Sequence, residues 1–184
     1  MTTPASDSRP MGPSSTGLFN WLDRRVTGVL VHPTSLPSDQ GIGVFDQAAF
    51  DLVDFFAATA VKYWQLCPLG PTGYGDSPYQ CFSSFAGNPY LIDLVPLVSA
   101  GLLTDADLQP LRRLGRDHVD YGALYEHKPP LLFAAHATWI RNSKPELPYG
   151  DFTAFQKKHA AWIADYALFS ALKDHFGGKP WWEW

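Results

Sequence analysis

A proline- and glycine-rich run from Leu66 to Asp93 limits the fold of this chain more than any other feature. It reads LCPLGPTGYGDSPYQCFSSFAGNPYLID, and its four prolines and four glycines exclude a regular helix or a long strand. The run also carries five aromatic residues, which is too many for a flexible linker: Tyr74, Tyr79, Phe82, Phe85 and Tyr90. We therefore expect a rigid loop, and its rings and small polar side chains suit a sugar ring or a nucleobase.

Charge and motif spacing narrow the choice of ligand. The 184 residues carry 14 Lys+Arg against 18 Asp+Glu, without the clustered cations that bind nucleic-acid phosphates, so no nucleic-acid partner is expected. The segment GPTGYGDSP lacks both the Gly-Lys-Ser/Thr ending of a P-loop and the Rossmann spacing. Nucleotide binding is therefore not favoured, and we expect no cofactor.

Two cysteines, Cys67 and Cys81, lie beside or within the loop. Neither a CxxC pair nor a Cys/His metal spacing is present, so we expect no metal site. Two reduced thiols are the favoured state, although the count also permits a disulfide. The sequence shows no leader-like or membrane-spanning apolar run, which predicts a cytoplasmic protein without a membrane partner.

The residues before the loop predict a strand–helix–strand unit. TGVLVH at residues 27–32 and VKYWQLCPL at residues 61–69 are short apolar runs stopped by proline, as expected of buried strands. Between them, apolar residues from Phe45 to Phe56 recur at helical spacing and acidic residues fill the other face. The strands are therefore expected to be parallel with a right-handed crossover. The loop then follows the carboxyl end of the second strand, where ligand sites of α/β folds cluster.

After residue 93 the pattern becomes helical. Residues 94–114 predict short helices broken at Gly101 and Pro110, with Thr104 or Asp105 as a cap.

Two longer helices are predicted beyond these. Residues 121–142 predict a helix with Pro129 and Pro130 in its first turn or at a kink. Residues 151–176 predict one continuous helix ended by the glycine pair at 177–178.

These segments divide the chain into three predicted parts. Residues 1–18 are expected to be a disordered tail, residues 19–93 a βαβ part with the binding loop, and residues 94–184 a mostly helical insertion. Three tryptophans within the last four residues would leave an exposed apolar cluster at the end of the chain. Two strands also cannot close a (β/α)8 barrel, which takes about 250 residues. We therefore expect the chain to be the front part of a longer, truncated protein.

Few side chains qualify for chemistry. His32 ends the first strand, where a site role and a structural role are equally expected, and Asp76 is the carboxylate in the most convincing setting, followed by Asp93. Glycoside chemistry needs a pair of carboxylates across the scissile bond. The three glutamates, Glu126, Glu146 and Glu183, are expected at the surface or in the terminal tail. We therefore expect no catalytic residue in this chain.

Five segments in order resemble the 4-α-glucanotransferases, also called amylomaltases or disproportionating enzymes. They are VLVHPTSLPSDQGIG (29–43), YWQLCPLGPTGYGDSPYQ (63–80), FAGNPYLID (85–93), VDYGALY (119–125) and DYALFSALK (165–173). The resemblance implies the N-terminal portion of a (β/α)8 barrel of the α-amylase type, with a helical subdomain inserted after the second strand. It implies transfer of a 1,4-α-glucan segment to the 4-hydroxyl of an acceptor, with retention through a covalent intermediate. The Asp nucleophile, Glu acid/base and second Asp of the family align beyond Trp184.

The resemblance also assigns substrate contacts. Ser77 and Tyr79 match positions of the donor subsite beside the nucleophile, and Tyr74 and Tyr125 match a second, outlying glucan site. Together with Asp76 and His32, these residues are the expected contacts of α-1,4-glucans and maltooligosaccharides. Two functions stay open: a glucan-transferring enzyme of which this is the front part, or a non-catalytic glucan-binding fragment.

Overall fold

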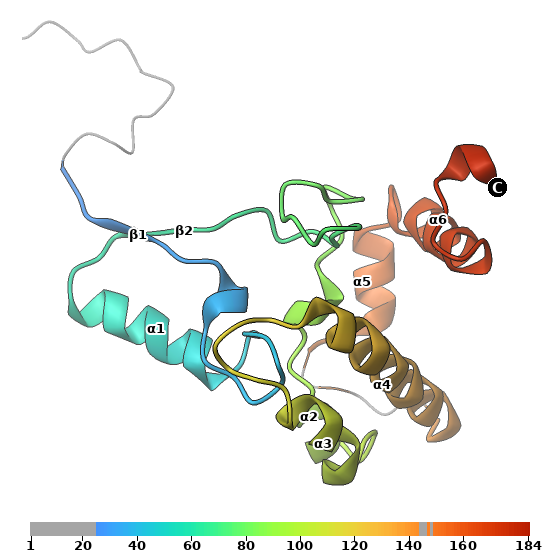
Figure 1. Cartoon of the computed structure of the whole chain (residues 1–184), viewed down its shortest axis with the longest axis horizontal. Helices are drawn as coiled ribbons and strands as arrows, with labels where there is room; N and C mark the ends of the chain where they lie inside the picture. Colours follow the sequence, from blue (N-terminus) through green and yellow to red (C-terminus); the bar gives the residue numbers. More distant parts are fainter. Residues whose placement is uncertain (1–24, 144–146, 148) are drawn as a thin grey trace, which may run out of the picture.

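The computed structural model describes residues 25–143, 147 and 149–184 (Figure 1). The predicted tail at residues 1–18 lies outside the described residues. In chain order the elements are β1 (Gly28–Leu30), the 3₁₀ helix η1 (Pro33–Ser35), α1 (Gln47–Ala58), β2 (Tyr63–Gln65), η2 (Pro89–Leu91), α2 (Val95–Ser99), η3 (Asp105–Leu108), α3 (Gln109–Arg112), α4 (Tyr121–Arg141), α5 (Phe152–Lys158), α6 (Ile163–His175) and η4 (Trp181–Glu183).

The strand–helix–strand prediction is confirmed: β1 and β2 form a parallel pair in which Gly28 faces Tyr63 and Leu30 faces Gln65, with α1 between them in the sequence. The strands are shorter than predicted, and the expectation that they are buried is wrong, because Leu30 is 60% exposed. Among the described residues the sheet has two strands, and α1 lies along one side of it (Figure 1). No helix of the described part covers its other side (Figure 1).

Asp46 caps the N-terminus of helix α1, since its carboxylate accepts the Ala48 N–H at 2.9 Å. Its apolar residues do not all turn inward: Phe56 is buried and packs edge-on against Trp64 at 6.1 Å, whereas Phe55 is 59% exposed. The single apolar face expected from Phe45 to Phe56 is therefore only partly buried.

The core lies between the 42–44 turn, α2, η3, α3 and α4. Its buried members are Ile42, Val44, Leu94, Leu97, Leu102, Leu103, Leu108, Leu111, Leu124 and Ala135. It takes residues from both sides of the predicted boundary at residue 93, so that boundary stays a prediction.

The predicted cap before η3 is confirmed, because Asp107 accepts hydrogen bonds from the N–H and the hydroxyl of Thr104, both at 2.7 Å. Pro110 does not break a helix but lies in the first turn of α3.

Helix α4 runs without interruption from Tyr121 to Arg141, with Pro129 and Pro130 in its interior rather than in its first turn. The expected single helix over residues 151–176 is also wrong, since α5 ends at Lys158 and α6 starts at Ile163.

The break between α5 and α6 contains a side-chain hydrogen bond. The indole of Trp162 donates to Nδ1 of His159 at 3.2 Å, and Trp162 leaves helical geometry with φ −140°. The predicted end of the second helix at Gly177 and Gly178 is confirmed, since both glycines have positive φ angles of 65° and 76°.

The terminal tryptophans are partly anchored. Trp184 stacks on Phe176 at 5.6 Å, while Trp181 and Trp182 remain 67% and 69% exposed. No helix among the described residues is long and apolar enough to cross a membrane.

We predict that Gly43→Ala lowers the free energy of unfolding by about 2–3 kcal/mol, because a Cβ there would collide with the backbone of Pro33 and Leu36. Chemical denaturation measures the change. Gly115→Ala is the matched control, since its Cβ would meet nothing within 4 Å. Equal stability of the two variants would contradict this close packing of the 33–43 turn.

Candidate functional site

The loop that follows β2 is ordered by its own hydrogen bonds. Thr72 and Cys81 form an antiparallel bridge, and the Phe82 N–H donates to the Pro71 carbonyl at 3.0 Å. The tip turns through Gly75 and Asp76, with φ angles of 89° and 53°. Both cysteines are free thiols.

Two phenylalanines of the loop fix it to α6 and the residue before it. Phe85 stacks on Trp162 at 5.8 Å with an interplanar angle of 20°, and Phe82 packs against Phe169 at 6.5 Å. The Lys173 ammonium lies 4.8 Å from the centre of the Phe82 ring. These ring contacts join the loop to the helical part, although Phe85 itself stays 71% exposed. The tyrosines of the loop are the candidate ligand contacts.

A small cavity of about 120 Å³ brings His32 and Asp76 together. Its lining residues are His32, Thr34, Cys67, Pro68, Thr72, Asp76, Pro78, Asn88 and Tyr121. Because ligand pockets usually measure about 300–1,000 Å³, this cavity holds only part of a sugar, and the remainder must lie against the exposed rings outside it.

His32 lines this cavity, and one nitrogen of its ring has no hydrogen-bond partner among the described residues. Its Nδ1 accepts the Thr34 N–H at 3.4 Å and lies 2.8 Å from the Thr34 hydroxyl oxygen. Because Nδ1 accepts the Thr34 N–H, Nε2 is left as the donor nitrogen of the ring. Nε2 is buried and has no hydrogen-bond partner among the described residues. A ligand hydroxyl would satisfy it.

Asp76 lies in a desolvated setting. Burial raises the pKa of its carboxyl, and a hydrogen bond with the Thr72 side chain opposes that rise. Its charge also contributes, after burial, to the raised pKa values of Tyr90 and Tyr121. One carboxylate, Asp76, lines the small cavity.

Tyr79 and Ser77 lie beside the cavity rather than in its wall. Tyr79 is 75% exposed, and its hydroxyl lies 3.7 Å from the sulfur of Cys67, a contact that raises the pKa of the phenol. The Ser77 hydroxyl accepts the Tyr79 N–H at 3.3 Å. The exposed ring is free to face a ligand that enters the cavity.

The two tyrosines of the expected second glucan site are also exposed: Tyr74 fully and Tyr125 by 72%. Neither lines the small cavity. Their joint role stays a prediction.

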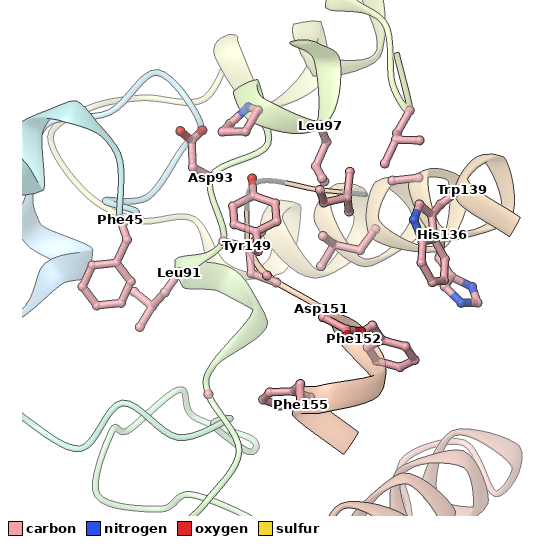
Figure 2. A pocket seen from close by; sticks show the side chains of 18 of the residues that line it. Phe45, Leu91, Asp93, Leu97, His136, Trp139, Tyr149, Asp151, Phe152 and Phe155 are labelled. Carbon is pink, nitrogen blue, oxygen red and sulfur yellow. The ribbon is translucent and has the colours of Figure 1, made fainter. Parts of the chain in front are cut away.

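A larger open cleft of about 1,350 Å³ lies between α4, α5 and the segment from η2 to α2 (Figure 2). None of the predicted contact residues lines this cleft, and the sequence did not predict the cleft. Its carboxylates have structural partners: Asp151 caps α5 at the Thr153 N–H, and Asp93 accepts from the Gln40 amide at 2.6 Å. Asn88 lines both cavities.

Sequence reasoning missed several residues of the small cavity. Thr72 and Asn88 were recognised only as small polar side chains of the loop, while Thr34 and Tyr121 come from segments far away in the sequence. No local pattern marks the last two. Among the described residues no group of three or more His, Cys, Asp or Glu side chains could hold a metal ion.

Comparison with known proteins gives consistent matches. The family described as 4-alpha-glucanotransferase matches residues 31–184. The 4-alpha-glucanotransferase of Thermus thermophilus is 50% identical over 160 residues, covering 87% of this chain and 31% of the relative. That of Streptococcus pneumoniae (strain TIGR4) is 42% identical over 165 residues, covering 89% of this chain and 32% of the relative.

A solved structure, the amylomaltase from Streptococcus agalactiae in complex with acarbose, superposes with a TM-score of 0.77 at 41% identity. The match covers 88% of this chain and 32% of that one. The chain thus spans about a third of the length of the relatives it matches.

We predict that Phe85 and Trp162 are energetically coupled by about 1 kcal/mol, because their stacked rings hold the loop on the helical part. A double-mutant cycle with Phe85→Leu and Trp162→Leu, followed by denaturant unfolding, measures the coupling. The control cycle pairs Phe85→Leu with Phe50→Leu on α1, where we expect additivity. Additive effects in the first cycle would show that the stack does not anchor the loop.

Proposed function

Because this chain belongs to the 4-alpha-glucanotransferase family, we propose that the protein transfers a segment of a 1,4-α-glucan to the 4-hydroxyl of an acceptor glucan or glucose. The observation that carries the proposal is the convergence of His32 and Asp76 on one cavity beside the exposed ring of Tyr79. Hydrogen-bonding groups at the base and an aromatic face at the rim match the hydroxyls and the C–H faces of a glucose unit.

We assign the fold of the whole protein to a (β/α)8 barrel of the α-amylase type, with β1 and β2 as its first two strands and the helices after residue 93 as an insertion. The parallel pairing of β1 and β2 supports this assignment. So does the position of the loop directly after β2, since barrel enzymes carry their sites on the loops that follow the strands.

Each proposed contact has a distinct task at the donor subsite. The Tyr79 ring packs on a sugar face and sets its orientation, with its backbone N–H held by Ser77. Asp76 accepts a sugar hydroxyl, and Nε2 of His32 donates to a sugar oxygen from inside the cavity. Fixing the donor sugar in this way favours a near-attack geometry.

The proposed reaction retains the anomeric configuration by double displacement. Such a mechanism needs a carboxylate nucleophile and an acid/base carboxylic acid on opposite sides of the glycosidic bond, about 5–5.5 Å apart. Within the described part of the chain Asp76 is the one carboxylate that lines the small cavity, so we assign neither catalytic role to this chain. Its residues bind and orient the glucan.

We further propose that Tyr74 and Tyr125 bind longer glucans at a second site on the surface. Their exposed rings support that role, because an aromatic face in water loses little by meeting a sugar face. Glucans and maltooligosaccharides are the proposed partners, in line with the acarbose bound to the similar amylomaltase. A cytoplasmic location stays a prediction.

Glucan binding without transfer is the second candidate function, favoured by the lone carboxylate of the small cavity. Incubation of the 184-residue chain with maltotriose distinguishes the two. We expect bound sugar but no glucose or longer maltooligosaccharides from this chain alone. Disproportionation that Asp76→Asn abolishes would show that the chemistry resides in these residues.

We predict that Tyr79→Ala lowers kcat/KM of the intact protein on maltotriose roughly 100-fold, because the donor sugar loses the surface that orients it. The melting temperature should change little, since the ring is 75% exposed. Tyr79→Phe, the control, keeps the ring and should keep most activity. Early melting of Tyr79→Ala with normal turnover of the folded fraction would make the tyrosine structural.

We predict that Tyr74→Ala and Tyr125→Ala each weaken binding of long glucans several-fold and leave turnover of maltotriose unchanged, because the second site contacts only long chains. Affinity gels with amylose and assays on maltotriose measure the two effects. An equal loss on short and long substrates would place these tyrosines in the main cleft.

A further inference from the structure

Lys128 is the largest fully buried side chain among the described residues, with 0% of its surface exposed. A lysine in this setting is unusual, because burial removes the water that stabilises its charge. It lies in the interior of α4, directly before Pro129, where no sequence pattern marks it as special.

The ammonium of Lys128 donates to the backbone carbonyl of Tyr90 in η2 at 2.8 Å. No carboxylate among the described residues lies within ion-pair distance of it. Tyr90 is in turn bonded to Asn88, which lines the small cavity. The Tyr90 N–H donates to Oδ1 of Asn88 at 2.9 Å. A hydrogen-bond chain therefore runs from α4 through Tyr90 to Asn88.

Asn88 is the member of this series of hydrogen bonds that lines the small cavity. It is 8% exposed, lines the small cavity with His32 and Asp76, and its own N–H donates to the Leu69 carbonyl at 2.7 Å. Because Oδ1 is engaged by Tyr90, the amide NH₂ remains as a donor, and it has no partner among the described residues.

We infer that Lys128 is a positioning residue for the glucan site: it fixes the Tyr90 carbonyl and thereby holds the Asn88 amide against the small cavity, where that amide donates to a sugar hydroxyl. The part of this inference that concerns the sugar rests on the proposed function. The hydrogen-bond chain itself does not.

The buried positive charge of Lys128 destabilises the fold. Burial lowers its pKa to about 8, and the negative charges of Asp93 and Asp46 only partly oppose that shift. Since the unfolded chain binds the proton more tightly, the charge destabilises the fold below about pH 8, and stability from this group rises between that pH and the pKa of the unfolded lysine. Apolar replacement of a buried charge is often neutral or stabilising.

Stability and binding should therefore separate in Lys128→Met. At pH 7 we expect a melting temperature equal to or above that of the wild type, together with about a tenfold weaker affinity for maltoheptaose by calorimetry. Leu124→Ala is the matched control: it removes a fully buried side chain from the same helix but no bond to η2. It should lower the melting temperature and leave the affinity of the folded protein unchanged.

A second readout needs no sugar. In NMR spectra of the free protein, the Asn88 side-chain amide and the Tyr90 N–H should titrate with an apparent pKa near 8, and Lys128→Met should abolish this titration. Asp93 and Asp46 are the charged groups that act on the ammonium, and Asp93→Asn shows how far that carboxylate contributes.

The outcomes are distinguishable. If the amide titration is present but no maltooligosaccharide binds, the proposed function fails and the positioning role of Lys128 stands. If maltoheptaose binds wild type and Lys128→Met equally, or if both Asn88 and Tyr90 signals are indifferent to the substitution, the inference is wrong. Lys128→Met could instead lower both the melting temperature and the apparent affinity, while its folded fraction binds maltoheptaose as tightly as the wild type. Lys128 would then be an ordinary packing residue.

Discussion

The backbone between residues 88 and 94 is the constraint on which the rest of the structure depends. Three hydrogen bonds from two segments distant in sequence reach it: the Gln40 amide oxygen accepts the Leu94 N–H at 3.0 Å, the Phe45 N–H donates to the Leu91 carbonyl at 3.0 Å, and Lys128 donates to the Tyr90 carbonyl. These bonds join the turn before α1 and helix α4 to one stretch of chain. The core and the candidate site meet at this stretch.

The loop before that stretch divides its aromatic residues between two tasks. Phe82 and Phe85 contact rings of the helical part, although both remain partly exposed, Phe85 by 71%. Tyr74 and Tyr79 face solvent, at a cost in exposed apolar surface that a ligand would recover. The tyrosines are therefore available to contact a sugar, because the phenylalanines join the same loop to the helical part.

The sequence patterns predicted the structural features that depend on residues close together in the chain. The parallel pair around Val29 and the cap at Thr104 follow from strand and helix signals within a few residues. The break at Trp162 was not predicted, and the ring stack of this residue joins it to Phe85, far away in sequence. Likewise the aromatic loop was found from its composition, but the burial of Lys128 depends on which elements pack around it, which no periodicity records.

The central claim is that the cavity at Asp76 and the ring of Tyr79 receive an α-1,4-glucan. Titration of the isotope-labelled protein with maltoheptaose, followed by NMR, tests it directly. The account predicts chemical-shift changes concentrated at residues 72–79 and none at residues 152–156, which line the larger cleft of Figure 2. Shifts confined to residues 152–156, with the loop unchanged, would contradict it.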